Sequence, residues 1–293
     1  MSPVSTTRAT SLDVQPIAGS LGAEVTGIDC TLALDDQQAA ALRAAVVAHK
    51  VIFLRGQRYS VDALEHITER LGGHGETPFL RSISGHPGVV QVVKEASEGG
   101  FNFGGAWHTD YSFQEAPPSF TLLWSVEVPP HGGDTLWSNQ ELAFDRLSEG
   151  LKAMLRRLRA VHSAGNAYAA DGFLARTAAG RTMQIDTNDD ALAEQVHPVV
   201  RVHPDTGREA LFVNPTYTTR FEGWTALESK PLLDQLHAHS VREGHTCRFR
   251  WTPDTLTIWD NRCTQHLAID DYRGFRREMY RSTVGGTPPT GAA

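Results

Sequence analysis

Residues 101–121 read FNFGGAWHTDYSFQEAPPSFT, and Trp107-His108-Thr109-Asp110 within them decides how the rest of the chain is interpreted. In an extended segment alternate side chains point to the same side, so an imidazole and a carboxylate two positions apart can meet one metal ion. A second histidine from elsewhere would complete the set of two histidines and one carboxylate that suits non-haem Fe(II) and leaves positions open for substrate and oxygen. The pattern predicts an iron site if such a histidine exists.

A single His-x-Asp pattern carries little weight by itself. With 13 histidines in the chain, the pattern is expected roughly 0.8 times by chance. A second example, His203-Pro204-Asp205, is followed by Thr206-Gly207, and these residue types predict a turn between two strands. The first example therefore needs support from the rest of the chain.

Composition bounds the class of protein. The chain has 293 residues, of which 40% are hydrophobic and 21% charged, and this is ordinary for a globular protein. The net charge of −7 and the scattered arginines argue against nucleic acid or an anionic membrane surface as a partner. Three cysteines are too few for a disulfide scaffold, and no segment has the length of a membrane span or the core of a signal peptide. We therefore expect a cytoplasmic enzyme or binding protein.

Apolar runs interrupted by Gly and Pro predict many short strands, and apolar residues near helical spacing predict a few helices. The predicted strands lie at residues 14–28, 51–54, 89–93, 119–128, 135–138, 196–202, 210–213, 246–251, 255–259 and 276–284, and the predicted helices at residues 34–50, 59–71, 139–147, 149–158 and 226–243. This balance predicts a mainly β fold with flanking helices, of the double-stranded β-helix or jelly-roll type.

The same reading predicts a single domain at residues 13–286. Residues 1–12, rich in Ser and Thr, are expected to form a disordered tail, and residues 287–293 a flexible one. A long insertion near residues 164–195 has the composition of a loop, and such loops often form lids over a site.

The end of the chain supplies the missing histidine and two arginines. His266 follows the apolar strand predicted at residues 255–259, and Arg277 and Arg281 share one face of the last predicted strand. Two arginines on one face of a core-like strand are costly unless each meets an anion. The planar guanidinium suits a carboxylate or a sulfonate. The residues alone leave open whether these anions are structural carboxylates or bound small molecules.

Motifs along about residues 14–286 closely resemble those of the taurine dioxygenase family of Fe(II)/2-oxoglutarate-dependent oxygenases. They are Trp107-His108-Thr109-Asp110, Pro117-Pro118, Gly132-Gly133-Asp134-Thr135-Leu136-Trp137, His197-Pro198-Val199-Val200, Leu211-Phe212-Val213-Asn214, Thr218-Thr219-Arg220 and residues 259–281. The resemblance implies the jelly roll of the clavaminate synthase and taurine dioxygenase type. It also implies a homodimer or homotetramer.

Residue by residue, the resemblance implies that His108, Asp110 and His266 are the catalytic iron ligands. It assigns Arg277 and Thr135 to 2-oxoglutarate, and Arg281 to the anionic head of the prime substrate. The implied reaction uses O2, hydroxylates a substrate C–H bond and releases succinate and CO2. Asp110 favours hydroxylation, because halogenating relatives have a small residue there. A hydroxylated carbon that bears a heteroatom leaving group would collapse to an aldehyde or ketone.

The expected substrate pocket departs from that of the taurine enzyme. Thr77 takes the place of a sulfonate-binding histidine, and Gly104 and Tyr111 replace an amide side chain and a valine. Residues 78–90 and 202–286 are more similar to the aryloxyalkanoate dioxygenases of the same family. We therefore expect a small anionic substrate, of the sulfonate, sulfate ester or aryloxyalkanoate type, whose body lies against a partly aromatic set of residues. These are Phe79, Leu80, Tyr168 and Tyr217.

Two other classes of function stay open from the sequence. One is a jelly-roll binding protein without catalysis, and the other is an iron enzyme with the same ligands that does not use 2-oxoglutarate. The presence of Thr135 together with Arg277 favours the 2-oxoglutarate enzyme, because these two residues have no evident task without that co-substrate. A visible charge-transfer band that forms with Fe(II) only when 2-oxoglutarate is added would separate the possibilities.

Overall fold

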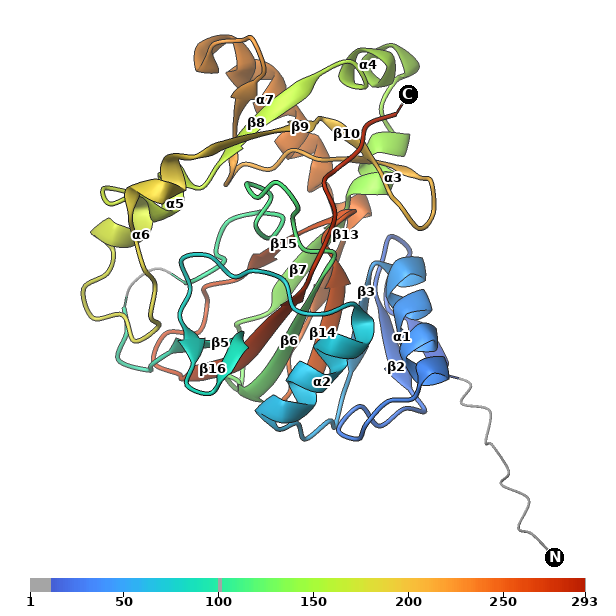
Figure 1. Ribbon diagram of the computed structural model, residues 1–293, viewed down its shortest axis with the longest axis vertical. Helices are drawn as coiled ribbons and strands as arrows, with labels where there is room; N and C mark the ends of the chain where they lie inside the picture. Colours follow the sequence, from blue (N-terminus) through green and yellow to red (C-terminus); the bar gives the residue numbers. More distant parts are fainter. Residues whose placement is uncertain (1–11, 100–101, 293) are drawn as a thin grey trace, which may run out of the picture.

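The computed structural model describes residues 12–99 and 102–292, so residues 1–11 of the predicted N-terminal tail lie outside the described part (Figure 1). The strands are β1 (Asp13–Pro16), β2 (Ala23–Thr26), β3 (Val51–Leu54), β4 (Ser82–Ile83), β5 (His86–Lys94), β6 (Phe120–Glu127), β7 (Thr135–Asn139), β8 (Arg159–Ser163), β9 (Glu194–Pro198), β10 (Val200–Val202), β11 (Glu209–Leu211), β12 (Thr218–Phe221), β13 (Thr246–Phe249), β14 (Thr255–Asp260), β15 (Thr264–Ala268) and β16 (Arg277–Val284). The helices are α1 (Asp36–His49), α2 (Val61–Leu71), α3 (Gln140–Asp145), α4 (Glu149–Leu155), α5 (Gly165–Tyr168), α6 (Phe173–Arg176) and α7 (Ala226–Ser240), with 3-10 turns η1 (Asp189–Leu192) and η2 (Glu243–His245).

The largest sheet has eight strands in the order β1-β2-β3-β14-β6-β16-β5-β4. Every residue of β3 is buried, and its side chains alternate between two separate cores. Ile52 and Leu54 join the core beneath helices α1 and α2, whereas Val51 and Phe53 face the inside of the β structure. A continuous apolar run is thus explained by a strand covered on both faces.

A three-stranded sheet, β13-β7-β15, faces the inner side of the large sheet. Its residue Trp137 has no exposed surface, and its ring lies at 5.4 Å from Phe53 and 5.8 Å from Trp259 of the large sheet. The two sheets therefore close on a common core, as the predicted jelly roll requires. Because side chains alternate, β16 places Arg277, Met279 and Arg281 on this inner side.

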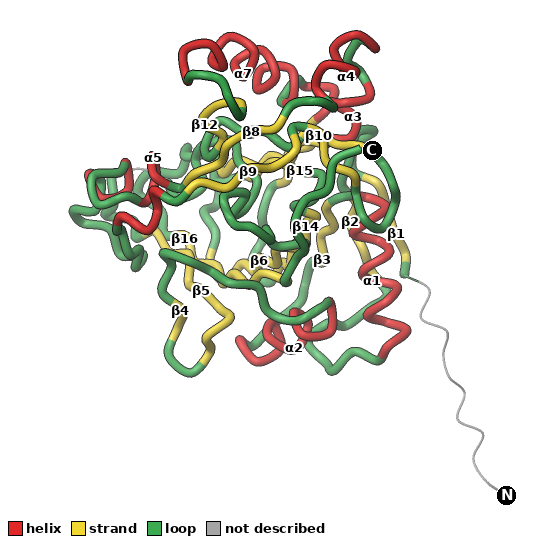
Figure 2. Tube along the Cα trace, turned by 45° about the horizontal axis from the view of Figure 1, so that its top comes forward, coloured by secondary structure: helices red, strands yellow, loops and turns green. Residues whose placement is uncertain are grey.

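Helices lie outside the strands, with α1 and α2 at one end of the molecule and α3, α4 and α7 at the other (Figures 1 and 2). Helix α1 begins with a capping box in which Asp35 and Gln38 satisfy each other's backbone amides. Ser60 caps α2 through its hydroxyl, which accepts from the backbone amide of Ala63. None of the described helices is long and apolar enough to cross a membrane.

Most predicted elements are present, but several parts of the structure differ from the prediction. Strands β4, β8, β12 and β15 were not predicted, and the insertion near residues 164–195 contains α5, α6 and η1. The turn predicted at His203-Pro204-Asp205 does join β10 to β11, but His203 itself is buried. In the segment predicted as a flexible C-terminal tail, Thr290 accepts a backbone hydrogen bond from Val202, and Gly291 bridges to Arg201.

Candidate active site

The site is built where the loop before β6 meets β15. His108 lies in that loop and His266 on β15, and their backbones pair as an isolated antiparallel bridge. The two imidazole rings are 4.1 Å apart between centroids. Both side chains are buried, with residue exposures of 7% and 8%. The fold thus brings together two histidines that are remote in the sequence.

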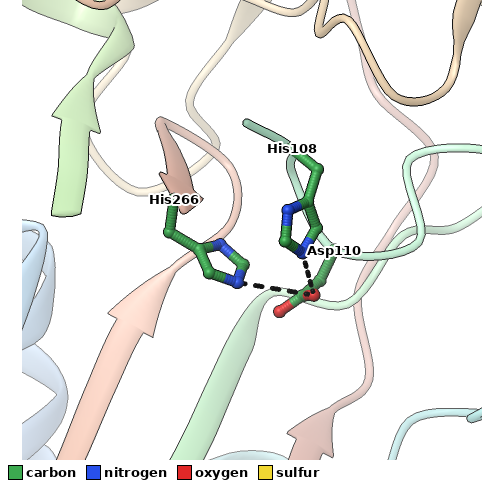
Figure 3. Close-up of side chains that lie close together, drawn as sticks. All are labelled: His108, Asp110 and His266. Atoms are coloured by element: carbon green, nitrogen blue, oxygen red, sulfur yellow. Dashed lines mark ion pairs between the residues drawn. The ribbon is translucent and has the colours of Figure 1, made fainter. Parts of the chain in front are cut away.

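Asp110 completes the cluster predicted from the sequence (Figure 3). Its Oδ1 lies 3.5 Å from Nε2 of His108 and 3.9 Å from Nε2 of His266. One ligand atom from each of the three residues falls within 4.8 Å of the others. The intervening Thr109 points elsewhere, its hydroxyl donating to the carbonyl of Thr264. The alternation expected of an extended segment therefore holds here.

Hydrogen bonds fix which atoms face the centre of the cluster. Nδ1 of His108 lies 2.8 Å from the carbonyl oxygen of Ala106, which makes Nδ1 the protonated nitrogen and leaves the Nε2 lone pair toward Asp110. Oδ2 of Asp110 accepts from the Thr121 hydroxyl at 2.7 Å, which leaves Oδ1 toward both imidazoles. Two imidazole nitrogens and one carboxylate oxygen that converge in this way fit a non-haem Fe(II) ion.

A buried chain of side chains supports the carboxylate. Thr121 accepts from the amide of Asn261 at 2.8 Å, and the oxygen of Asn261 accepts from the indole of Trp259 at 3.0 Å. All three residues are buried. His266 has no such partner, because its buried Nδ1 makes no hydrogen bond among the described residues. Its ring is held instead by its backbone and by packing against Trp259, at 4.7 Å between centroids.

Burial and neighbouring charges set the protonation of the cluster. Burial alone would raise the pKa of Asp110, but Arg281 and the two imidazoles outweigh it and hold this pKa well below its usual range. Burial and the neighbouring His108 lower the pKa of His266 well below its usual value. The carboxylate is therefore ionised and His266 is neutral near pH 7, as metal ligation requires.

The two arginines of β16 lie next to the cluster, but they have different partners. Nη2 of Arg281 forms an ion pair with Oδ1 of Asp110 at 2.7 Å, and its guanidinium lies over the ring of Tyr111 at 4.9 Å. Arg277 is 4% exposed and pairs with no carboxylate among the described residues, and its Nε has no acceptor there. One arginine of the predicted pair thus lacks an anion.

These side chains line a small chamber. It has a volume of about 40 Å³, and it contains the three clustered residues, both arginines and Thr135. Thr135 lies on β7, where its hydroxyl accepts from the indole of Trp251 at 3.0 Å. The structure therefore brings together the five residues predicted for the metal and the co-substrate, and with them Arg281, which was predicted for the prime substrate. The chamber's other walls, which sequence reasoning did not identify, include Val92, Phe103, Leu123 and Trp259.

A larger, mainly apolar cavity of about 310 Å³ adjoins the chamber, and both are lined by Phe103, Gly104 and His108. Of the residues predicted for the substrate, Tyr168 and Tyr217 line this cavity. Phe79 stacks on Tyr168 at 5.1 Å, and the buried Leu80 bridges to Ile185 of the insertion. The cavity's remaining residues were not predicted: Gly105, Ala106, Asn166, Ala167, Phe173, Leu174, Pro215 and Thr216.

Phe79 and Leu80 are not among the residues that line this cavity, and neither are two further predicted substrate residues, Thr77 and Tyr111. Tyr111 is buried beneath Arg281, and Thr77 is half-buried in the loop between α2 and β4, outside the linings of both the chamber and the cavity. Their roles as substrate contacts stay predictions. The position of Tyr111 suits a support for the Arg281 guanidinium.

A second buried group, Glu141, His203 and Cys263, also has metal-binding residue types close together. Both nitrogens of His203 are engaged, however. Nε2 lies 2.9 Å from Oδ2 of Asp260, and Nδ1 accepts from the backbone amide of Asp205. His203 has no free lone pair for a metal, so this group is a structural network.

Comparison with known proteins decides the family. Residues 13–283 match the model of the family described as taurine catabolism dioxygenase TauD, TfdA. The chain belongs to this family. It is 37% identical over 287 residues to an alpha-ketoglutarate-dependent sulfate ester dioxygenase of Pseudomonas putida, covering 97% of this chain and 92% of that protein. It is 32% identical over 283 residues to an alkylsulfatase of Acinetobacter baylyi, covering 96% and 87%.

Solved structures agree with this assignment. A crystal structure of a taurine dioxygenase from Burkholderia xenovorans superposes with a TM-score of 0.80 at 33% identity, covering 96% of this chain and 93% of that one. A taurine dioxygenase family member with these relatives is an Fe(II)/2-oxoglutarate-dependent oxidoreductase, as predicted. The binding-protein alternative is set aside, and so is the iron enzyme that does not use 2-oxoglutarate.

Proposed function

We propose that this dioxygenase hydroxylates the carbon next to the head group of a small sulfate ester that has an apolar body. The observation that carries the proposal is that two buried guanidinium groups, Arg277 and Arg281, lie in one chamber with the metal-binding cluster. A buried cation needs an anion. Arg277 has none among the described residues, and Arg281 is paired with Asp110 Oδ1, the oxygen assigned to the metal in this proposal, so the co-substrate and the substrate would supply the two anions. The relatives named as a sulfate ester dioxygenase and an alkylsulfatase favour the sulfate ester class.

In this proposal His108, Asp110 and His266 hold Fe(II). The free Nε2 of His108, the Oδ1 of Asp110 and the neutral state of His266 support these roles. When bound, the iron supplies the activation of O2 that is coupled to the conversion of 2-oxoglutarate into succinate and CO2. The protein orients the ligands through Thr121 and Ala106, and Trp259 shields His266 from water.

Arg277 and Thr135 bind the distal carboxylate of 2-oxoglutarate. Arg277 is suited to this because its Nε has no acceptor among the described residues, and it shares the chamber with Thr135. An ionised carboxylate would satisfy the buried guanidinium through charge-assisted hydrogen bonds. The Thr135 hydroxyl already accepts from Trp251, so its own proton remains available for the carboxylate.

Arg281 binds the sulfate head, and the apolar body extends into the cavity beside His108. That cavity, at about 310 Å³, has roughly twice the volume of one that holds a benzene ring, so it suits an alkyl chain or a substituted ring. With the head on Arg281, the adjoining carbon lies on the side of the chamber next to the ligands. Hydroxylation of that carbon gives an unstable hemiacetal ester, which breaks its C–O bond to release sulfate and an aldehyde.

A second substrate class is favoured by one feature, the aromatic character of the pocket wall. Tyr168, Phe173 and Tyr217 line the cavity, so a phenoxy ring would find aromatic partners there. Outside the lining, Phe79 stacks on Tyr168, and Phe113 lies 4.9 Å from Tyr217 between ring centroids. A 2,4-dichlorophenoxyacetate dioxygenase of Cupriavidus pinatubonensis is 29% identical over 291 residues. Aryloxyalkanoates are therefore the alternative to sulfate esters.

The experiment is succinate release from 2-oxoglutarate in air with Fe(II) and ascorbate. The panel contains hexyl and octyl sulfate, taurine, other sulfonates and aryloxypropanoates, with Asp110→Ala as the control. We expect alkyl sulfates to stimulate release most strongly and the stimulation to vanish in the variant. Stimulation by aryloxypropanoates alone would select the second class. Equal release with every compound would contradict an anion-specific pocket.

A further inference from the structure

The chamber continues past Arg277 into two further spaces that the proposed reaction does not use. A narrow cavity of about 20 Å³ shares Val92, Phe103 and Arg277 with the chamber. It shares Glu98, Phe103 and Arg181 with an outer cavity of about 230 Å³. The outer cavity is lined by exposed residues of the insertion, including Ala179 and Gly180. A line of spaces therefore leads from Arg277 to the surface.

The narrow cavity is unusually cationic. Among the described residues, Lys94, Arg181 and Arg277 line it, opposed by the single carboxylate of Glu98. Lys94 is bound to Asp270 at 2.6 Å. Arg181 donates through Nη1 to the carbonyl of Leu174 at 2.9 Å, but its buried Nε has no acceptor among the described residues, and the same is true of Arg277. Two buried donors that lack acceptors line one small space, and each is costly until an acceptor arrives.

We infer that these spaces form a path for dicarboxylates, the Arg181 path, by which 2-oxoglutarate reaches Arg277 and succinate leaves. The inference rests on the proposed function, since it needs 2-oxoglutarate as co-substrate. Among the described residues, the lining of the substrate cavity contains no lysine or arginine, so that cavity offers an approaching dicarboxylate no cation. Cations along a low-dielectric passage attract an anion and raise its rate of association.

The constriction is formed partly by side chains that can move. A volume of about 20 Å³ holds roughly one water molecule, so a dicarboxylate needs a wider opening. Phe103 and Arg181 are only half-buried, and Phe103 lines all four of these spaces. Rotation of such side chains is fast compared with turnover. Arg181 is therefore assigned as a transient carboxylate contact at the outer side of the constriction.

Removing the charge of Glu98 should change the association rate of 2-oxoglutarate in the opposite direction to removing the charge of Arg181. The Oε1 of Glu98 accepts from the backbone amides of Glu95 and Thr182, which holds the carboxylate at the boundary between the narrow and the outer cavity. A fixed negative charge at that position slows an approaching anion. Replacement by glutamine keeps an oxygen acceptor for both amides and removes the charge.

The experiment measures the rate at which 2-oxoglutarate binds to the anaerobic Fe(II) protein, followed by stopped-flow absorbance of the charge-transfer band. We expect Arg181→Gln to lower both the association and the dissociation rate by about tenfold, with Kd changed less than about twofold. Arg181→Lys keeps the charge and should stay within about threefold of the wild type. Glu98→Gln should speed association. Arg176→Gln removes an exposed cation of the same segment that lines none of these cavities, and should have no effect.

Unchanged association in a folded Arg181→Gln protein would overturn the path. A rise in Kd caused by faster dissociation alone would also overturn it, because Arg181 would then belong to the final binding site. If Arg181→Gln does not fold, Glu98→Gln decides, and an unchanged rate there overturns the path. Failure of the proposed function looks different, since the wild-type protein would then give no 2-oxoglutarate-dependent band, and the path would fall with it.

Discussion

His108 and His266 exchange both of their backbone hydrogen bonds, with His108 N donating to His266 O over 3.1 Å and His266 N donating to His108 O over 2.8 Å. The main chain thus fixes the two imidazoles relative to each other before any metal is bound. Asp110 is not held in this way, because its carboxylate depends on side-chain contacts with Thr121 and Arg281. The carboxylate is therefore the part of the cluster that is most sensitive to its surroundings.

Replacement of Thr121 by valine tests this dependence. The change keeps the shape of the side chain, but it removes the donor to Asp110 Oδ2 and the acceptor for Asn261. We expect metal affinity to fall by about 10- to 100-fold, as for other residues that orient a ligand. Titration with Mn(II) or Fe(II) measures this, and Thr121→Ser, which keeps the hydroxyl, should stay close to the wild type. Wild-type affinity in Thr121→Val would mean that the carboxylate is held by other contacts.

Substitution of each of the two arginines should weaken the binding of a different anion. Arg277→Gln should raise the KM for 2-oxoglutarate, and Arg281→Gln the KM for the prime substrate. Each loses a charge-assisted contact of about 1.5–3 kcal/mol, which corresponds to roughly 10- to 150-fold. Because Arg281 also pairs with Asp110, metal affinity must be measured in that variant. Equal effects of either variant on both KM values would contradict the division of roles.

The sequence predicts the apolar strands well and the polar buried strands poorly. The prediction of β3 and β14 is confirmed, because their buried positions, apart from Asp260 at the end of β14, are apolar or β-branched. By contrast, β15 has the sequence TQHLA, and its first three residues are buried although all three are polar. His266 faces the cluster, and the backbone carbonyl of Thr264 accepts from Thr109, whereas Gln265 donates to Gln140 and to the carbonyl of Val213. Hydrophobic periodicity has no signal for such a strand.

The site is predictable only as far as its residues carry a recognised motif. Thr121 and Asn261 were not predicted as a pair, because their contact joins positions separated by 140 residues and neither side chain is unusual in type. Phe103, which lines four cavities, also carries no local signal. By contrast, the spacing of Arg277 and Arg281 on one strand face did predict buried cations, because period-2 geometry depends on neighbouring residues alone.

Gly104 tests the junction between the chamber and the substrate cavity, since it lines both. Its φ is +76°, and an added Cβ would lie 3.5 Å from Cε1 of His108 and 3.8 Å from Cβ of Ala268. Gly104→Ala should cost about 1 kcal/mol of stability through backbone strain and narrow the junction. Relative to the wild type, we expect Gly104→Ala to lower kcat/KM for octyl sulfate more than kcat/KM for hexyl sulfate.

The matched control for Gly104 is Gly207→Ala, in the turn between β10 and β11. Gly207 has a φ of +71° and no atom within 4 Å of an added Cβ. An alanine there therefore adds the same backbone strain but contacts no neighbouring side chain. Thermal unfolding should show similar losses of stability in both variants. If Gly207→Ala changed the preference between the two sulfates as much as Gly104→Ala, strain rather than crowding would be responsible.

His197 gives the protein a predictable sensitivity to acid. Burial, only partly offset by a hydrogen bond to the carbonyl of Gln114, lowers the pKa of His197 to about 4. The unfolded chain protonates near the ordinary value of about 6.5. Below that pH the unfolded state binds more protons than the folded state, so the free energy of unfolding falls as the pH falls and levels off below about pH 4. At pH 5 the free energy of unfolding contributed by His197 is lower by roughly 2 kcal/mol than at pH 8.

The variant His197→Gln keeps a donor for Gln114 and cannot titrate. Its loss of unfolding free energy between pH 8 and pH 5, measured by urea denaturation, should therefore be smaller than that of the wild type by roughly this amount. An equal loss in both proteins would mean that His197 is already protonated in the folded state at pH 5.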